Sequence, residues 1–480
     1  MTHHDTLFIG GAWISPSGDQ TITVVSASTE EIIGSVPEAQ EADVDAAVAA
    51  ARAAADDPSG WATWEPSARA AAMERFADAL ERRNGEISRL VSAQNGMPVS
   101  ISSTFEAAFP AILLRYYAGV IKTAVFEERR PGLMGGSTVV RRFPVGVVGA
   151  IVPWNFPQSL AAFKYAPALA AGCTLVIKPS PETVLDTIPV AEAAVEAGIP
   201  AGVINYVPAG REVSAYLVSH PGVDKVAFTG STAAGRAIGE TCGRLLRPVT
   251  LELGGKSAAI VLDDADLNLA EMGQKLFQAT LLNNGQTCFL GTRVLAPRNR
   301  YAEVVDAFAA LAGSLTIGNA LDETTQIGPM VSAGQRERVE GYIAKGKAEG
   351  ARVVVGGGRP TSQGQGWFIE PTIFADVDNN HTIAQEEIFG PVLSLIPYTD
   401  DDDAIRIAND SNFGLGGTVW TRDADRGLGV ARRVQTGTIG INAYLPDPTA
   451  PFGGIKASGL GRELGPEAIA HYQQIQSIYT

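Results

Sequence analysis

The stretch that decides the fold begins with the apolar run VGVVGAIVP (residues 145–153) and continues through the helix-like run SLAAFKYAPALAAG (159–172) to a second apolar run, TLVIKP (174–179). Helix-like and strand-like runs then keep alternating: PVAEAAVEAG (189–198), VINYV (203–207), EVSAYLVS (212–219), KVAFTG (225–230), AAGRAIGETCG (233–243) and VTLEL (249–253). Near-continuous apolar strands between helices predict a parallel sheet covered on both faces. The sequence therefore predicts a doubly wound, Rossmann-like α/β domain.

A second alternating region starts at AAIVL (258–262) and runs to about residue 460, which predicts a second α/β domain. Two segments fit neither alternation: EERRPGLMGGSTVVRRFP (127–144) and the C-terminal QIQSIYT. Their mixture of β-branched and polar residues is typical of edge strands that pair with something outside their own domain.

The composition excludes several classes of protein. The 480 residues contain 52 acidic and 37 basic side chains, a net charge of −15, which argues against nucleic acid or an anionic membrane as a partner. Three cysteines imply no disulfide framework, and the five scattered histidines predict no metal site. The N-terminal residues do not resemble an export signal and no apolar run reaches about 18 residues, so we expect a cytoplasmic protein.

Two features at strand ends could contact a nucleotide. FTGSTAAGR (228–236) follows a strand and begins a helix, so Gly230, Ser231 and Gly235 could approach a phosphate. The segment is not a Walker A loop. Turns of this kind also occur as plain connections between a strand and a helix. Lys178 ends another strand, where an ammonium group could meet a ribose or a phosphate, although a solvated lysine is the simpler interpretation.

Three further residues could perform chemistry. In PWNFP (153–157) two prolines bracket Asn155, which either offers its side-chain amide as a donor or makes a structural turn. Glu252 in ELGGKS ends an apolar strand, so burial should raise its pKa and suit it to act as a base. Cys288 in NNGQTCFLGTR is either a buried inert thiol or a nucleophile that needs local activation.

Taken together, PWNFP, FTGSTAAGR, LELGGKS, GQTC, EEIFGPV (386–392) and PFGGIKASGLGRE (451–463), in this order, resemble the aldehyde dehydrogenase superfamily over nearly the whole chain. The resemblance implies that Cys288 attacks the aldehyde and that Glu252 activates the water that hydrolyses the thioester. It also implies that Asn155 and the Cys288 backbone N–H form the oxyanion hole, and that Lys164 and Glu463 relay the proton.

The resemblance further implies NAD as cofactor. Lys178 would contact the adenosine ribose, Ser231 the pyrophosphate and Glu387 the nicotinamide ribose, with Phe389 beside the nicotinamide ring. The other expected cofactor contacts are Pro153, Trp154, Ser180, Gly230, Gly235, Leu253 and Gly254. Many NAD-preferring members carry an acid three residues after this lysine, whereas this chain has Pro181 there and Glu182 one place later, so NADP stays possible.

Other implications concern substrate and assembly. Phe156, Phe163, Phe289 and Phe452 would line the aldehyde tunnel, which suits apolar aliphatic, terpenoid or aromatic aldehydes. The expected domains are residues 1–124 with 145–253 for NAD(P) binding, 254–462 for catalysis, and 125–144 with 463–480 as an arm that makes a homo-oligomer, dimer or tetramer. The general class is EC 1.2.1.3; the alternatives are a CoA-acylating semialdehyde dehydrogenase, against which Glu252 argues, and a relative that has lost catalysis.

Overall fold

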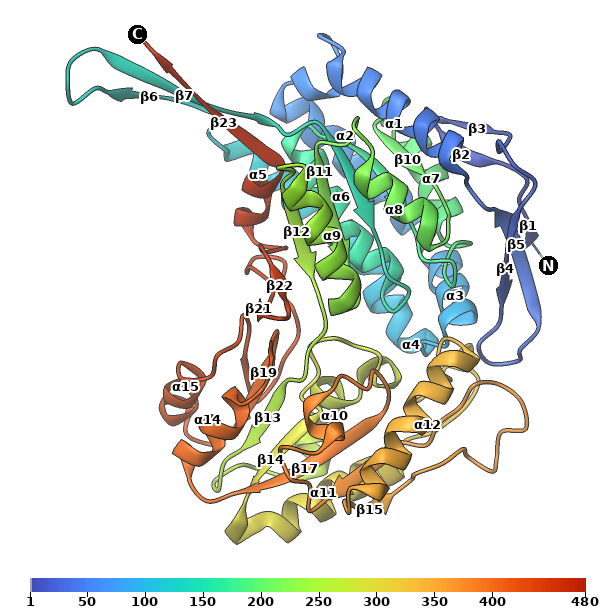
Figure 1. Ribbon diagram of the computed structural model, residues 1–480, viewed down its shortest axis with the longest axis vertical. Helices are drawn as coiled ribbons and strands as arrows, with labels where there is room; N and C mark the ends of the chain where they lie inside the picture. Colours follow the sequence, from blue (N-terminus) through green and yellow to red (C-terminus); the bar gives the residue numbers. More distant parts are fainter. Residues whose placement is uncertain (1) are drawn as a thin grey trace.

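The computed structural model describes residues 2–480. Two α/β domains lie one above the other in Figure 1, the first at the top and the second at the bottom, and a β arm projects from the first. This is the architecture that the alternation of apolar runs predicts.

A six-stranded sheet forms the centre of the first domain. Its order is β10 (Ile204–Tyr206), β9 (Thr174–Lys178), β8 (Val147–Ile151), β11 (Lys225–Thr229), β12 (Val249–Glu252) and β22 (Gly459–Leu460). The first five strands are parallel, as expected, but β22 is antiparallel and comes from the end of the chain, pairing Leu251 with Leu460. The last motif of the sequence is thereby brought beside Glu252.

Helices cover both faces of this sheet. They are α1 (Glu41–Asp56), α2 (Pro66–Glu81), α3 (Asn84–Asn95), α4 (Val99–Ser102), the π-helix η2 (Ser103–Ala108), α5 (Phe109–Thr123), α6 (Pro157–Ala171), α7 (Thr187–Glu196), α8 (Arg211–Ser219) and α9 (Thr232–Arg244). Every residue of α6 is buried, because this helix lies between the sheet and the helices α2 and α5. A helix that is apolar on all sides is expected to be buried in this way.

The N-terminal segment adds small peripheral sheets and one short helix to the first domain. These are β1 (Thr2–His3) with β5 (Ile32–Pro37) and β4 (Thr21–Val25), the hairpin β2 (Leu7–Ile9) with β3 (Ala12–Ile14), and η1 (Trp61–Thr63). The five strands lie at the right of Figure 1, on the opposite side from the arm.

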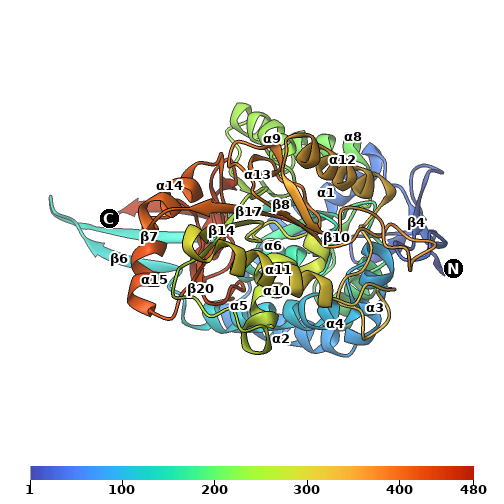
Figure 2. The ribbon, with the colours of Figure 1, turned by 90° about the horizontal axis from the view of Figure 1, so that it is seen from below.

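The second domain has a seven-stranded sheet. Its order is β15 (Arg352–Val355), β16 (Thr372–Ala375), β17 (Val392–Tyr398), β14 (Arg293–Pro297), β13 (Ala258–Val261), β19 (Gly417–Trp420) and β20 (Gly440–Ile441). All pairs are parallel except β15 with β16. Its helices, seen from below in Figure 2, are α10 (Leu269–Thr280), η3 (Leu282–Gly285), η4 (Arg298–Arg300), α11 (Tyr301–Ser314), α12 (Ala333–Ala348), α13 (Thr382–Gln385), α14 (Asp401–Asn409) and α15 (Ala424–Ala431). A short pair, β18 (Phe413–Gly414) with β21 (Ile455–Lys456), leads back toward the first domain.

The two segments that fit neither alternation make one sheet. Strands β6 (Glu127–Pro131), β7 (Ser137–Pro144) and β23 (Gln473–Tyr479) pair antiparallel and project from the body, with the C-terminus near the tip (Figure 1). Leu133 and Met134 in the hairpin turn are fully exposed. Before β23, η5 (Pro466–Tyr472) packs against α6. Within residues 2–480, no helix combines the length and the apolar character that crossing a membrane requires.

Candidate active site

The expected site residues meet where the two sheets face each other. On the first sheet, Asn155 follows β8, Lys178 ends β9, Ser231 follows β11 and Glu252 ends β12. From the second domain, Cys288 precedes β14 and Glu387 precedes β17. The site therefore uses the carboxyl edge of one parallel sheet, where ligands of such folds bind, and the amino edge of the other.

The segment before Cys288 has an unusual backbone. Asn283 and Asn284 have φ of +52° and +60°, and Gly285 continues the turn at +73°. Asparagine tolerates this left-handed conformation better than most residues. A side chain at position 285 would lie 2.2 Å from the Gly390 backbone, so only glycine fits there. The turn thus brings Cys288 to the cleft through contacts with a distant loop.

Hydrogen bonds join the Asn155 loop to the Cys288 loop. The Asn155 side-chain amide donates to the Gln286 carbonyl at 3.0 Å, and the Asn283 amide donates to the Asn155 carbonyl at 2.9 Å. Asn95 holds the same loop from behind, donating to the Trp154 carbonyl at 3.0 Å. These groups are buried, so the loops form one rigid unit.

Cys288 is half-buried at the base of this unit. Gly255 lies directly against it, since a side chain at position 255 would come within 2.2 Å of the Cys288 carbonyl oxygen. Burial raises the pKa of the Cys288 thiol, and the nearby carboxyls of Glu387 and Glu252 raise it further. These surroundings of Cys288 therefore favour the neutral thiol over the thiolate.

Glu252 lies in a buried cluster of charged groups. The Lys164 ammonium donates to Glu463 Oε1 at 2.8 Å and to the Thr229 hydroxyl at 2.6 Å. Burial raises the pKa of Glu252 well above its usual range, and the Glu463 carboxylate adds to the rise. Neither Glu252 oxygen has a hydrogen-bond partner among the described residues. Glu252 therefore lies near enough to Glu463 and Lys164 for their charges to affect it, but it forms no hydrogen bond with either.

A cleft of about 280 Å³ opens from Cys288 between the domains. Its lining residues are Pro153, Trp154, Asn155, Thr229, Gly230, Ser231, Leu253, Gly254, Cys288, Gln335, Arg338, Glu387 and Phe389. The Trp154 and Phe389 rings meet edge to face at 5.3 Å. Glu387 Oε1 accepts from the Gly255 N–H at 2.9 Å, while burial raises the pKa of Glu387 to about 7.

Helix α12 holds the loop that carries Glu387, and the sequence did not predict this contact. Gln335 donates to the Phe389 carbonyl at 2.7 Å, and Arg338 donates to the Glu387 carbonyl, also at 2.7 Å. The capping residue Ser332 predicts a helix start here, but nothing local in the sequence connects that helix to residues 50 positions later.

Two expected cofactor residues lie outside the lining of this cleft, at the end of β9. Lys178 is buried, which lowers its pKa to about 8, and Glu182 partly opposes this shift. The Ser180 hydroxyl hydrogen-bonds the Glu182 carboxylate. Gly235 also lies outside the lining: it lets α9 pack closely on Leu253.

The four expected tunnel phenylalanines belong to one buried cluster, against which Cys288 packs. Phe452 joins Phe163 and Phe289 with ring centroids 6.0 and 6.2 Å apart. Three aromatic residues that the sequence analysis did not single out extend the wall: Tyr444 lies 4.9 Å from Phe289, Phe109 lies 6.0 Å from Phe163, and Phe105 lies 6.0 Å from Phe156. The sequence could have indicated this part of the wall only through Phe105 and Phe109, which are four positions apart and so lie on one face of a helix.

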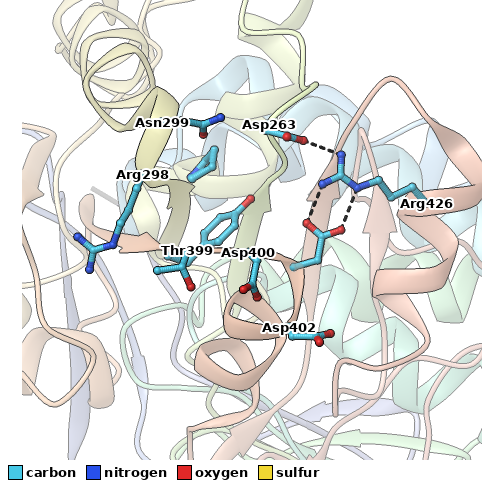
Figure 3. A pocket seen from close by; sticks show the side chains of 10 residues that line it. Asp263, Arg298, Asn299, Thr399, Asp400, Asp402 and Arg426 are labelled. Atoms are coloured by element: carbon cyan, nitrogen blue, oxygen red, sulfur yellow. Dashed lines mark hydrogen bonds and ion pairs between the residues drawn. The ribbon is translucent and has the colours of Figure 1, made fainter.

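A second cavity, of about 650 Å³, lies at the carboxyl ends of β13, β14 and β17 in the second sheet, and Figure 3 shows the side chains that line it. Arg426 spans its acidic wall, donating to Asp263 at 2.6 Å and to Asp401 at 2.7 Å. None of the expected site residues lines it.

Comparison with known proteins identifies the family. The model of the aldehyde dehydrogenase family matches residues 13–478. The chain is 58% identical to geranial dehydrogenase of Castellaniella defragrans over 99% of this chain and 98% of that protein. A solved aldehyde dehydrogenase of Mycobacterium tuberculosis in complex with NAD+ has a TM-score of 0.97 at 49% identity, covering 100% of this chain and 98% of that one.

A mutant of aldehyde dehydrogenase C of Pseudomonas syringae, solved with NAD+ and octanal, has a TM-score of 0.94 at 37% identity, covering 99% of this chain and 96% of that one. Sequence, fold and converging motifs agree along almost the full length. The chain belongs to the aldehyde dehydrogenase family, and it is an oxidoreductase that oxidises aldehydes.

Proposed function

We propose that the protein oxidises apolar aldehydes to carboxylic acids, with NAD+ as the hydride acceptor and Cys288 as a covalent nucleophile. This proposal rests mainly on the hydrogen bonds that join the Asn155 loop to the Cys288 loop. The two loops meet at the end of a cleft that Glu387 also lines. It brings a thiol, an oxyanion donor and a ribose acceptor to one place.

In the first half-reaction the Cys288 thiolate bonds to the aldehyde carbon, and the π electron pair of the carbonyl moves onto oxygen. One N–H of the Asn155 amide is engaged with Gln286, and the other can donate to this oxyanion beside the Cys288 N–H. A preorganised donor of this kind contributes about 3–4 kcal/mol to lowering the barrier. Bound NAD+ supplies the acceptor for the hydride that leaves the carbon, and a thioester on Cys288 remains.

In the second half-reaction a water molecule attacks the thioester carbon and Glu252 takes its proton. The carbon–sulfur bond breaks, so the acid leaves and the sulfur returns as a thiolate. The raised pKa of Glu252 suits a base that works near neutral pH. The Glu463–Lys164 pair beside it would then receive the proton.

The cleft fits a dinucleotide. The N-terminus of α9 at Ser231 offers backbone N–H groups for a pyrophosphate, and Glu387 can accept hydrogen bonds from ribose hydroxyls. Phe389 and Trp154 supply an apolar wall, and Lys178 would contact the second ribose. The carboxylate of Glu182, which lies beside Ser180, would repel a 2′-phosphate, so we favour NAD over NADP.

The aromatic wall favours an apolar substrate, because burial of chain carbons against phenylalanine contributes about 25 cal/mol per Å². A 58% identical relative is named for geranial, and a solved relative holds octanal. We therefore propose medium-chain, terpenoid or aromatic aldehydes, with geranial as the first candidate, in a broad activity of class EC 1.2.1.3.

Reduced-cofactor absorbance with geranial, octanal and succinate semialdehyde tests the proposal. We expect turnover of the first two with NAD, and none with Cys288→Ala. Glu252→Gln should give a burst of reduced cofactor and then stall at deacylation. Activity in Cys288→Ala, CoA-dependent turnover, or selectivity for succinate semialdehyde or a charged amino-aldehyde would contradict it.

The arm suggests self-association. Among residues 2–480, strand β6 has no pairing strand on its outer edge, and apolar side chains at the turn of the arm are exposed. We therefore propose that the arm pairs across a homodimer or within a tetramer. Light scattering at micromolar concentration checks this, and a monomer would contradict it. The expected domain boundaries and the cytoplasmic location remain predictions.

A further inference from the structure

Helix α6 begins without a capping side chain of its own. Phe156 occupies the N-cap position and Pro157 follows it, so the first N–H groups that need a partner belong to Gln158 and Ser159. Both residues are buried, and water therefore cannot satisfy these groups. Some other part of the chain has to supply an acceptor.

Glu106 supplies that acceptor from the π-helix η2. Its Oε2 accepts from the Gln158 N–H at 2.7 Å. The Ser159 hydroxyl also bonds to the carbonyl of Phe105, the residue beside Glu106. Burial raises the pKa of Glu106 to about 8, so near neutral pH the group is mostly the neutral acid, and its carbonyl oxygen can still accept this bond. Because π-helical turns are rare and cluster at functional sites, this capping geometry invites a functional explanation.

The start of α6 carries much of the proposed site. Asn155 and Phe156 immediately precede the helix, and Phe163 and Lys164 lie two turns along it. The Phe105 and Phe156 rings meet edge to face at 6.0 Å, so η2 touches the substrate wall and the oxyanion loop together. We propose that Glu106 is a positioning residue, which caps α6 from outside and thereby holds the Asn155 amide in its productive orientation. This inference rests on the role proposed above for Asn155.

A second set of contacts holds the same turn through the side chain of Gln158. The Gln158 side chain donates to Asp186 Oδ2 at 2.5 Å, and Gln94 donates to Asp186 Oδ1 at 2.7 Å. Gln94 also accepts the N–H groups of Val184 and Leu185. These bonds hold the segment after Lys178 without Glu106. Loss of Glu106 should therefore disturb the oxyanion donor and leave cofactor binding intact.

The test compares Glu106→Met with Glu106→Gln. Methionine fills the volume of the buried carboxyl and removes the acceptor, whereas glutamine keeps an oxygen that the Gln158 N–H can reach. We expect kcat of Glu106→Met to fall roughly ten- to hundredfold, the range that a misplacement of about 1 Å can cost. Glu106→Gln should stay within about threefold of the wild type, and Kd for NAD should change less than about twofold in both.

A double-mutant cycle with Asn155→Ala separates positioning from general damage. Once the Asn155 amide is absent, adding Glu106→Met should cost no further activity. The proposal would be overturned by additive losses of activity in the double mutant or by a rise in Kd for NAD that matches the fall in kcat. It would also be overturned if Glu106→Met kept wild-type activity, or if Glu106→Gln were as impaired as Glu106→Met.

Two further controls complete the design. If Glu106→Met does not fold, Glu106→Asp, which withdraws the carboxylate by one methylene, enters the same cycle with the same criteria. Wild-type activity of Asn155→Ala alone would instead refute the proposed oxyanion role, so the two failures are distinguishable.

Discussion

The side-chain amide of Asn283 donates a 2.9 Å hydrogen bond to the backbone carbonyl of Asn155, 128 positions earlier in the chain. The Asn155 amide donates in the opposite direction, to the Gln286 carbonyl two residues before Cys288. The donor and the nucleophile of the proposed site therefore keep one geometry, because each loop holds the other.

Replacing Asn283 by glycine tests this coupling. Glycine keeps the left-handed backbone at φ +52° and removes only the side-chain bond. If this bond contributes its usual net of roughly 1 kcal/mol to the transition state, its loss should lower kcat about fivefold. We expect Kd for NAD to stay unchanged, and steady-state kinetics with fluorescence titration measures both. An unaltered kcat at saturating aldehyde would show that the bond does not hold the donor.

Gly255 should tolerate no side chain, because an added Cβ would lie 2.2 Å from the Cys288 carbonyl oxygen. We expect Gly255→Ala to abolish most activity and to destabilise the protein by about 1–3 kcal/mol. Gly119, on the exposed face of α5, is the matched control: its Cβ would meet nothing within 4 Å. Gly119→Ala should keep activity and stabilise the protein by about 0.5–1 kcal/mol. Thermal unfolding and activity assays of the two variants check the contrast.

Iodoacetamide should alkylate Cys288 slowly at neutral pH, because burial and the Glu387 carboxylate raise the pKa of the thiol. Glu387→Gln removes a negative charge, so the pKa of Cys288 falls and alkylation at pH 8 becomes faster. Glu386→Gln, at the exposed neighbouring position, should leave the rate unchanged. Mass spectrometry of the labelled peptide over time gives the rates. Equal rates in all three proteins would remove Glu387 as a cause of the shift.

The affinity for NAD should depend on pH in both directions. Glu387, whose pKa burial raises to about 7, loses its ionised acceptor form as the pH falls below that value. Lys178, whose pKa burial lowers to about 8, loses its charge as the pH rises above that value. Both groups are in their binding forms only in between, so kcat/KM for NAD should be bell-shaped.

Two variants assign the limbs of that profile. Glu387→Gln should remove the acid limb and Lys178→Met the alkaline limb, each at reduced activity. A profile in which both variants keep both limbs would assign the titration to other groups.

Much of this molecule could be predicted from its sequence. The alternating apolar runs specify a doubly wound sheet and a second α/β domain, because a strand buried on both faces needs an apolar side chain at almost every position. The motifs at strand ends predict that Asn155 and Glu252 lie close together, because the ends of parallel strands meet at one edge. Cys288 precedes a strand of the second sheet, and only the family resemblance of its GQTC motif placed it with them. The poor fit of residues 127–144 and of the C-terminus to either alternation predicted strands of a different kind.

Only the tertiary structure decided which groups hold these residues in place. Asn95, Asn283, Gln335, Arg338 and Glu106 act across long separations in sequence, and polar side chains in helices or turns carry no local sign of a partner on another element. The pairing of β22 with the first sheet was likewise not predictable, because this strand has only two residues and so shows no alternation of apolar and polar side chains. Local periodicity records which face of an element is buried, whereas the hydrogen bonds that fix a site form only after distant elements have packed together.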